Sequence, residues 1–266
     1  MEQFNVFVPE DVLYQFKSAL AEEYRETYDR IRQELLNGPL IHIDETKTEL
    51  IGKPNGYVWV MASMDTVYYY FRPNRETEFL KEFLAGFEGV LVSDFYNGYD
   101  SLSCHQQKCL IHFIRDLNND LLINQMNTEY KTIVTDFGKL LRNIIATIDK
   151  YGLRKRNLRK HIKETESFYF GVINANYNTE LAINWQKRFK KNKGKLFNFF
   201  NFDGIPWNNN NGENAIKPFA KYRRRAKGAL RQSGLEDYLI LLSIQQTCKY
   251  RGINFLEFLK SKKSFF

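Results

Sequence analysis

Two aspartates stand where short apolar segments end, and their positions suggest metal chemistry. Asp44 follows the apolar residues of "PLIHIDET", and Asp94 follows those of "GVLVSD". Alternation along an extended chain places His42 on the same face as Asp44, and Val92 on the same face as Asp94. Two carboxylates held side by side repel each other unless a cation joins them. Magnesium suits such a site because it takes oxygen ligands and retains waters, and Mn²⁺ is a substitute.

The chemistry of such a site would be phosphodiester cleavage. Two ions about 4 Å apart activate a water or sugar hydroxyl on one side of a phosphodiester and stabilise the leaving oxygen on the other. A third carboxylate is needed to complete the set of ligands. For each aspartate taken singly, the alternative is a structural role in which the carboxylate caps the loop after the strand.

The elements that must position these residues begin with a helix and a meander. Apolar spacings of three and four predict one helix over residues 10–37, after which the period changes to that of strands. Turns are predicted at Pro54-Asn55-Gly56 and at Met64-Asp65. Three strands linked so closely should be antiparallel, and they are expected over residues 39–50, 56–64 and 66–73.

Two further strands should complete an α/β sheet. A helix over residues 74–87, with Asn74 as its candidate cap, is predicted to cross over to a fourth strand at residues 89–94. A fifth strand is expected at residues 108–114, "KCLIHFI". This order of elements, followed by helices, is typical of the ribonuclease-H-like mixed five-stranded sheet. Its strand order 3-2-1-4-5 places the first and fourth strands side by side, where ligands collect near strand ends.

The rest of the chain is predicted to be mostly helical. Over residues 116–200, interruptions are expected near Gly138, Gly152 and Gly171. A helix is expected to begin near Glu213, to be bent or ended by Pro218, and to pass into "KYRRRAKGALR". Two amphipathic segments separated by Gly252 close the chain.

We therefore expect four parts along the chain. They are an N-terminal helical segment over residues 1–39, the first part of the core over 40–117, a helical insertion over 118–200, and C-terminal helices that complete the core over 201–266.

Composition predicts a globular cytoplasmic protein. The 266 residues are 43% hydrophobic, which is enough for a substantial core. No stretch approaches the roughly 18 apolar residues of a membrane span, and the acidic start "MEQFNVFVPEDV" is unlike a signal peptide. Cys104, Cys109 and Cys248 fit no disulfide framework, so we expect free thiols in a reducing compartment.

The positive charge of the chain is concentrated in one region. Residues 151–231 hold 19 lysines and arginines but only five acidic residues, in a chain whose net charge is +8. Such a region fits a polyanion such as nucleic acid. The alternative is a solvated helical surface that binds nothing.

Four motifs in order make the chain resemble the insertion sequence 66 family of transposases. They are "IHIDET", "FEGVLVSDFYNGY", "KCLIHFIRDL" and "WNNNNGENAIKP" with the arginines that follow it, and the C-terminal "SIQQTCKYRGINFLEFL" is also similar. The resemblance covers residues 25–262 and is weak in the middle. It implies a bacterial, nucleoid-associated enzyme with a ribonuclease-H-like catalytic domain and a DDE metal site.

Carried onto this sequence, the resemblance implies that Asp44, Asp94 and Glu213 are the catalytic metal ligands, with two Mg²⁺ ions. The implied reaction is DNA strand cleavage and strand transfer, with transposon ends and target DNA as partners and a homodimer or higher oligomer on DNA. Glu213 has an alternative role, because its spacing from Asn210 is that of a capping box.

Further residues are candidates for contact with DNA. Cys109, His112 and Arg115 match a Cys-x-x-His-x-x-Arg strand of the family, and zinc is not expected because a strand would point Cys109 and His112 to opposite faces. Trp207 is expected either to pack in the core or to stack on an unpaired base. The candidates for DNA binding are His112, Arg115, Lys217, Arg223, Arg224 and Arg225, with residues 154–163 as secondary contacts.

Departures from the family pattern keep other functions open. Asn214 and Asp116 stand where family members usually carry arginine, which lowers the expected DNA affinity or activity. Only 43 residues precede Asp44, where family members carry a sizeable N-terminal region. The alternatives are therefore a truncated, inactive remnant that only binds DNA, and a structure-directed nuclease that cuts without joining.

Overall fold

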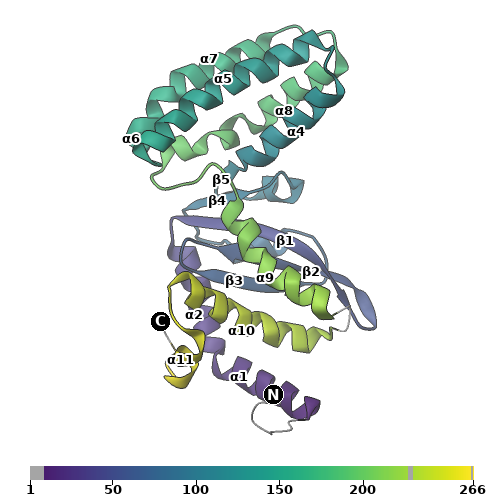
Figure 1. Ribbon diagram of the computed structural model, residues 1–266, viewed down its shortest axis with the longest axis vertical. Coiled ribbons are helices and arrows are strands. Elements are labelled where there is room, and N and C mark those ends of the chain that lie inside the picture. Colours follow the sequence, from purple (N-terminus) through teal and green to yellow (C-terminus); the bar gives the residue numbers. More distant parts are fainter. Residues whose placement is uncertain (1–8, 227–229, 265) are drawn as a thin grey trace. The chain divides into compact units, whose positions relative to one another are not determined.

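The computed structural model describes residues 9–226, 230–264 and 266, and its five strands form a mixed sheet (Figure 1). The strand order is β3-β2-β1-β4-β5, as the order of elements predicts. β1 (Leu40–Leu50), β2 (Lys53–Ala62) and β3 (Val67–Arg72) form an antiparallel meander. β4 (Val90–Ser93) and β5 (His105–Lys108) are parallel.

The chain divides into two compact units. The first, called the meander unit below, comprises the described residues within Met1–Gly89, Gly98–Cys104 and Asn210–Phe266. The second, the helical unit, comprises Val90–Asn97 and His105–Asn209.

One face of the meander is covered by two helices, α9 (Asn210–Ala226) and α10 (Gln232–Tyr250). Alternation along the strands sends Val58, Val60 and Tyr69 to this face, where they form a buried cluster with Ala215 and Phe219 of α9. Figure 1 shows α9 lying across β1 and β2. This face therefore holds the main core of the meander unit.

Helix α10 also covers the edge of the sheet at β3. The amides of Val67 and Tyr69 donate to Thr247 Oγ1 at 3.1 Å and to Ser243 Oγ at 2.9 Å. These two hydroxyls are one helical turn apart, which matches the spacing of alternate amides along the strand. The helix thereby satisfies donors that an uncovered edge strand would expose.

The opposite face of the meander is aromatic. Trp59 makes an edge contact with Phe79 of α3 (Glu78–Phe83), with ring centroids 5.3 Å apart. Tyr68 stacks on Tyr28 of α2 (Arg25–Asn37) at 4.3 Å. The buried area of these rings holds α2 and α3 against the sheet.

Three local predictions in the meander unit are wrong. The single helix predicted over residues 10–37 is two helices, α1 (Glu10–Glu23) and α2, because the chain breaks at Tyr24, whose buried ring packs on Phe258 of α11 (Phe255–Lys260). The first turn of the meander lies at Ile51 and Gly52, where Gly52 has a φ of +66°. Residues 54–56, predicted as that turn, belong to β2.

The third wrong prediction concerns the helix after β3. Thr77, not Asn74, precedes α3, and Asn74 forms hydrogen bonds with Glu76 instead. The helix is therefore shorter than its apolar pattern suggests, because its first predicted turn is a local side-chain turn. The predicted turn at Met64 and Asp65 is confirmed.

The long helices of the helical unit run side by side (Figure 1). Phe113 lies at the centre of their aromatic core, with ring centroids 5.2 Å from Trp185, 5.7 Å from Phe137 and 4.9 Å from Phe189. None of the helices in the described ranges is long and apolar enough to cross a membrane. The helices of this unit are α4 (Leu110–Ile123), α5 (Thr128–Tyr151), α6 (Lys155–Leu158), α7 (Ile162–Asn174) and α8 (Glu180–Leu196), with single turns η3 (Arg159–His161) and η4 (Asn198–Asn201).

Of the three glycines predicted to interrupt these helices, one does so. Gly152 ends α5 with a φ of +70°, a conformation that glycine adopts at little cost. Gly138 and Gly171 lie inside α5 and α7, contrary to the prediction. A single helical glycine costs about 1 kcal/mol relative to alanine, which the buried aromatic faces of these helices offset.

The fifth strand is the largest error in the predicted elements. The sequence predicts a strand over residues 108–114. In the structure, β5 ends at Lys108 and α4 begins at Leu110. The apolar residues Leu110, Phe113 and Leu117 have helical spacing and form the buried face of α4. The strand itself is polar, and Gln107 is buried because its side chain bonds to the Leu196 carbonyl at 2.8 Å and to the Phe199 amide at 3.0 Å.

Replacement of Gly56 by alanine should destabilise the meander unit. A Cβ atom there would lie 2.3 Å from a ring carbon of Phe71 and 2.8 Å from the Arg72 carbonyl oxygen. We expect Gly56→Ala to lower the free energy of unfolding by about 1–3 kcal/mol, measured by urea denaturation. Gly171→Ala is the control, because its Cβ meets open space and alanine favours a helix. Equal effects of the two substitutions would contradict this packing argument.

A carboxylate joins the starts of α5 and α8 in the helical unit. Glu129 accepts hydrogen bonds from Thr179 Oγ1 at 2.7 Å, from the Thr179 amide at 2.9 Å and from the Asn178 amide at 3.0 Å. The Thr179 hydroxyl and these amides lower the pKa of Glu129 to about 2. The charged form of Glu129 is therefore the one that stabilises the fold.

The stabilisation by Glu129 should disappear in acid. Because its pKa is depressed in the folded state, its contribution is complete above the unfolded pKa of about 4.3 and is lost as the pH falls toward 2. At pH 6, the melting temperature of Glu129→Gln should be lower than that of the natural chain. The difference between the two melting temperatures should shrink between pH 4.3 and 2. Asp149→Asn, at an exposed position of α5, should show no such convergence. A difference independent of pH would refute the role of the charge.

Candidate functional site

Asp44 lies on β1 and points to the face of the meander that α9 covers. It is directly opposite Val60 of β2, and opposite residues of an antiparallel pair share a face. Val60 belongs to the buried cluster that contains Ala215 and Phe219 of α9. Asp44 is half-buried, and its Oδ1 accepts the Glu45 amide at 2.9 Å. The carboxylate thus sits where the apolar part of β1 ends, as predicted.

Glu213 lies in the first turn of α9, and that turn is fixed at the same end of the face. Asn211 Nδ2 donates to the Ser63 carbonyl at 2.6 Å and Oδ1 accepts the Tyr250 hydroxyl at 2.9 Å. Ser63 follows Ala62, which is opposite His42, two residues before Asp44. Asp44 and Glu213 therefore belong to one face and one end of the meander unit.

Helix α9 passes into the polybasic segment as predicted, but Pro218 does not end it, and residues 227–229 of that segment lie outside the described residues. The helix begins at Asn210, before Glu213, and it continues through Pro218 to Ala226. Proline removes the amide that would donate to the Asn214 carbonyl, but Asn214 is exposed, so water can replace that bond. Burial of Ala215 and Phe219, on either side of the proline, holds the helix together.

Asp94 belongs to the helical unit and directly follows β4, as predicted. Its Oδ1 accepts the Tyr96 amide at 2.9 Å, so the carboxylate caps the following loop. This is the structural role expected of an aspartate at the end of a strand. The short 3₁₀ helix η2 (Asn97–Ser101) comes next. This hydrogen bond holds the carboxylate in one orientation.

Lys108 is a buried cation beside the Asp94 loop that the sequence analysis missed. Its side chain is almost fully buried, and Nζ donates to Ser93 Oγ at 3.1 Å and to the Asp94 carbonyl at 2.9 Å. Ser93 and Lys108 are partners in the parallel pair of β4 and β5. Lysine is almost never buried without partners, but the sequence around Lys108 contains no signal that it would be.

The start of α4 brings Cys109 and His112 together, and the prediction that they point to opposite faces is wrong. Cys109 is the residue before the helix, and its Sγ accepts the Asn209 amide at 3.3 Å. Burial raises the pKa of this thiol, but hydrogen bonds from the His112 side chain and from the amides of His112 and Asn209 outweigh burial, and the pKa lies below its ordinary value. The Leu110 amide donates to the carbonyl of half-buried Trp207 at 2.9 Å.

All three cysteines are free thiols, as predicted. Cys109 and Cys248 are buried, whereas Cys104 is half-buried. Burial raises the pKa of Cys248 to about 11, so its thiol is protonated at neutral pH. Cys109 differs from Cys248 because its hydrogen-bond donors favour the thiolate.

The arginines and lysines proposed to contact DNA are not equally available. Arg224 and Arg225 are exposed at the end of α9. Arg223 donates to Thr46 Oγ1 at 2.8 Å and to the Lys47 carbonyl, so its guanidinium attaches α9 to β1. Lys217 is exposed and donates to Asn214 Oδ1 at 2.6 Å.

On the helical unit, Arg115 is exposed on α4. Asp116, which follows it, forms an ion pair of 2.5 Å with Arg188 of α8. The Arg188 guanidinium also lies over the Trp185 ring, 4.6 Å from its centroid. The carboxylate at position 116 therefore has a packing role between α4 and α8.

Comparison with known proteins gives one family. The model of a family described as "Transposase IS66 family" matches residues 1–237. The chain is also similar to uncharacterized protein y4qI of Sinorhizobium fredii (strain NBRC 101917 / NGR234), at 23% identity over 288 residues, which cover 96% of the chain and 52% of that relative. The chain thus spans about half the length of this curated relative. No solved structure matches the chain.

Replacement of Lys108 by methionine should destabilise the helical unit. Methionine keeps most of the volume but leaves the Ser93 hydroxyl and the Asp94 carbonyl without this donor. Loss of a partner from a buried polar group costs about 1–3 kcal/mol, which urea denaturation would measure. Lys131→Met on the exposed face of α5 is the matched control. Equal stability of the two variants would show that the buried ammonium contributes nothing.

Proposed function

Because the chain belongs to the IS66 family of transposases, we propose that it catalyses DNA strand cleavage and strand transfer of an insertion sequence. Asp44, Asp94 and Glu213 are the proposed catalytic residues. The observation that carries the proposal is the placement of Asp44 and Glu213 on one face and at one end of the meander unit, on β1 and on the first turn of α9. The third carboxylate follows β4, the neighbour of β1 in the strand order.

The strand order also supports a ribonuclease-H-like catalytic core. In an open sheet whose order is β3-β2-β1-β4-β5, the order reverses between β1 and β4. Asp44 lies where the apolar part of β1 ends, and Asp94 lies directly after β4. In this proposal the helices over residues 118–200 are an insertion, and residues 201–266 complete the core.

The donor set fits Mg²⁺, with Mn²⁺ as a substitute. All three proposed ligands are carboxylates, which are the oxygen donors that these ions prefer. Amide donors orient two of them, because Asp44 Oδ1 accepts the Glu45 amide and Asp94 Oδ1 accepts the Tyr96 amide. Two bound Mg²⁺ ions would lower the pKa of the attacking hydroxyl group and stabilise the charge on the leaving oxygen.

The proposed reaction has two steps. A water molecule attacks a DNA phosphorus atom and the P–O3′ bond breaks, which leaves a 3′-hydroxyl and a 5′-phosphate. That 3′-hydroxyl then attacks a phosphodiester of the target and displaces its 3′-oxygen. Asp44, Asp94 and Glu213 would hold the ions, which would supply charge stabilisation to the reacting phosphate, and Lys108 holds the peptide of Asp94 in place.

The proposed partners are the transposon ends and the target DNA. Arg115, Lys217, Arg224 and Arg225 are exposed cations that suit backbone phosphates, and His112 is the further candidate for phosphate contact. Arg223 contributes by attaching α9 to β1. We further propose that the protein acts as a homodimer or higher oligomer on DNA, in the bacterial cytoplasm at the nucleoid.

Asp94→Asn should abolish metal-dependent nicking of DNA. The substitution keeps the size of the side chain and removes its charge, so we expect a rate loss of about 100-fold or more on supercoiled plasmid with Mg²⁺ or Mn²⁺. Conversion of supercoiled to open-circular DNA is followed on agarose gels. Asp149→Asn removes the same charge from an exposed position of α5 and should nick at the natural rate.

Other outcomes would identify other functions. If the natural chain and Asp94→Asn are equally inert while DNA still binds with steep salt dependence, the chain is a DNA-binding protein without turnover. If the natural chain cuts a radioactively labelled duplex but never joins its 3′-end to a plasmid, it is a nuclease. Either result would overturn the transposase proposal.

A further inference from the structure

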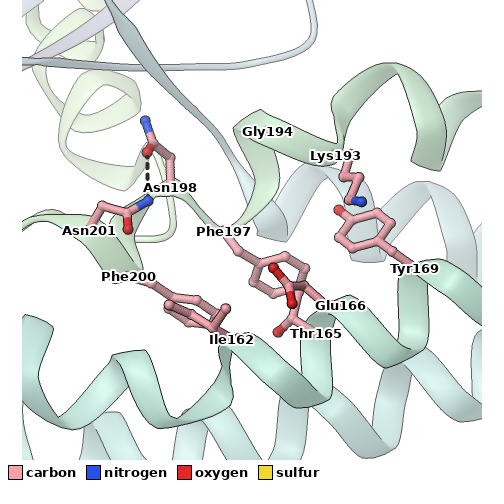
Figure 2. Close-up of a pocket in the computed structure, with 10 residues that line it drawn as sticks. All are labelled: Ile162, Thr165, Glu166, Tyr169, Lys193, Gly194, Phe197, Asn198, Phe200 and Asn201. Atoms are coloured by element: carbon pink, nitrogen blue, oxygen red, sulfur yellow. Dashed lines mark hydrogen bonds between the residues drawn. The ribbon is translucent and has the colours of Figure 1, made fainter.

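A hollow of about 500 Å³ opens on the helical unit between α7, the end of α8 and η4 (Figure 2). Its inner wall is aromatic. Phe197 and Phe200 are nearly buried, and their rings lie 5.4 Å apart at an angle of 28°. The volume is in the range of about 300–1,000 Å³ that small-ligand sites occupy.

Two buried hydroxyl groups in the wall of this hollow have no partner in the described chain. Thr165 is 6% exposed and Tyr169 is 1% exposed, yet neither Thr165 Oγ1 nor the Tyr169 hydroxyl makes a hydrogen bond within the described residues. An unsatisfied buried hydroxyl costs about 1–3 kcal/mol. Both side chains line the hollow, so a ligand that moves the neighbouring side chains aside would supply the missing partners.

The rim of the hollow is polar and carries a cation. The ammonium group of exposed Lys193 lies 5.7 Å from the centroid of the Tyr169 ring, and Figure 2 shows the Tyr169 hydroxyl directed toward the end of Lys193. The exposed carboxylate of Glu166 is an acceptor on the same rim. On the far side, the Asn201 amide donates to Asn198 Oδ1 at 3.3 Å.

A second hollow of about 600 Å³ continues from the first. It shares Glu166, Tyr169 and Lys193 with the first hollow and extends to Phe170 and Lys163. Phe170 is 72% exposed, so its side chain is accessible to a ligand. Together the two hollows form a track that is lined by aromatic rings and by Lys163 and Lys193.

We propose that these two hollows bind an unpaired stretch of a DNA strand. One base would lie against Phe197 and Phe200, with its polar edge at the hydroxyls of Thr165 and Tyr169, and the next base would stack on Phe170. Single strands bind in this way to many proteins, on aromatic platforms flanked by cations that hold the phosphates.

The length of the track favours a strand over a free nucleotide. A nucleoside monophosphate has the same base and phosphate, but it would fill only the first hollow. The second hollow, with Lys163 and the exposed Phe170, continues beyond a single nucleotide. This inference rests on the proposed function in one respect, because DNA is the substrate of that function.

Binding of a fluorescein-labelled, mixed-sequence single strand of about 15 nucleotides, without metal, tests the proposal. Fluorescence anisotropy with the full chain should show that Tyr169→Phe weakens binding about three- to tenfold, the effect of one lost hydrogen bond. Lys193→Gln should weaken binding and lower the salt slope by about 0.7. Tyr151→Phe and Lys131→Gln, at exposed positions outside both hollows, should bind as the natural chain does.

Stability separates a binding role of Tyr169 from a structural one. Phenylalanine removes a buried hydroxyl that has no partner in the described chain, so Tyr169→Phe should melt at the same temperature as the natural chain or higher. A lower melting temperature together with weaker binding would mean that the hydroxyl supports the fold, and would overturn the proposal. Unchanged strand binding in both Tyr169→Phe and Lys193→Gln would also overturn it.

Competitors identify the source of the bound base. Unlabelled single strand should displace the probe at concentrations at which deoxyadenosine monophosphate and a blunt duplex do not. Equal displacement by the monophosphate would make the hollow a nucleotide site, and an equal effect of Tyr169→Phe on duplex binding would exclude recognition of unpaired bases. Either result would overturn the proposal.

Failure of the strand site and failure of the proposed function give different results in these assays. Plasmid nicking in Mg²⁺ depends on Asp94, whereas the anisotropy assay contains no metal and involves no cleavage. Nicking that depends on Asp94, with strand binding unaffected by Tyr169→Phe and Lys193→Gln, would overturn only the strand site. Strand binding that depends on these two residues, without any nicking, would overturn only the enzymatic function.

Discussion

The attachment of α9 to the meander is the constraint on which the proposed site depends, because it decides where Glu213 lies. Three hydrogen bonds along the helix fix this attachment. The Asn211 amide donates to the Ser63 carbonyl, the Tyr69 hydroxyl to the Ala215 carbonyl, and the Arg223 guanidinium to the Thr46 hydroxyl. Burial of Phe219 between them supplies the apolar part of the attachment. The helix therefore keeps its course across β1 and β2 although Pro218 removes one of its hydrogen bonds.

The surroundings of Asp94 are organised differently, by buried polar groups. Lys108 binds Ser93 and the Asp94 peptide, Gln107 binds the backbone of residues 196 and 199, and Cys109 accepts amides at the start of α4. Such groups stabilise a fold only when all their partners are in place. They fix the geometry of this end of the helical unit, as the proposed role of Asp94 requires.

Some charged side chains of the basic region form contacts within the fold, and others stay exposed at the surface. Arg223 and Arg188 belong to the basic region, yet one attaches α9 to β1 and the other pairs with Asp116 above an aromatic core. Arg224, Arg225 and Lys193 remain exposed. The Asp116 pair explains why an acidic residue is accommodated on α4, because it neutralises an arginine that packs against Phe113 and Trp185.

Much of this architecture was determined by sequence alone, because local periodicity and turn chemistry report local structure. The meander and the place of Asp44 and Asp94 after apolar runs follow from alternation in a few consecutive residues, and the strand order follows from the order of the elements along the chain. Contacts in the folded chain fix where β5 ends, where α4 begins and that α9 continues through Pro218. In each case the decisive partners are distant in sequence: Leu196 for Gln107, Asn209 for Cys109 and Tyr69 for Ala215. The break at Tyr24 has the same cause, since Phe258 packs on its ring. A pattern read along the chain contains no information about contacts that only folding brings together.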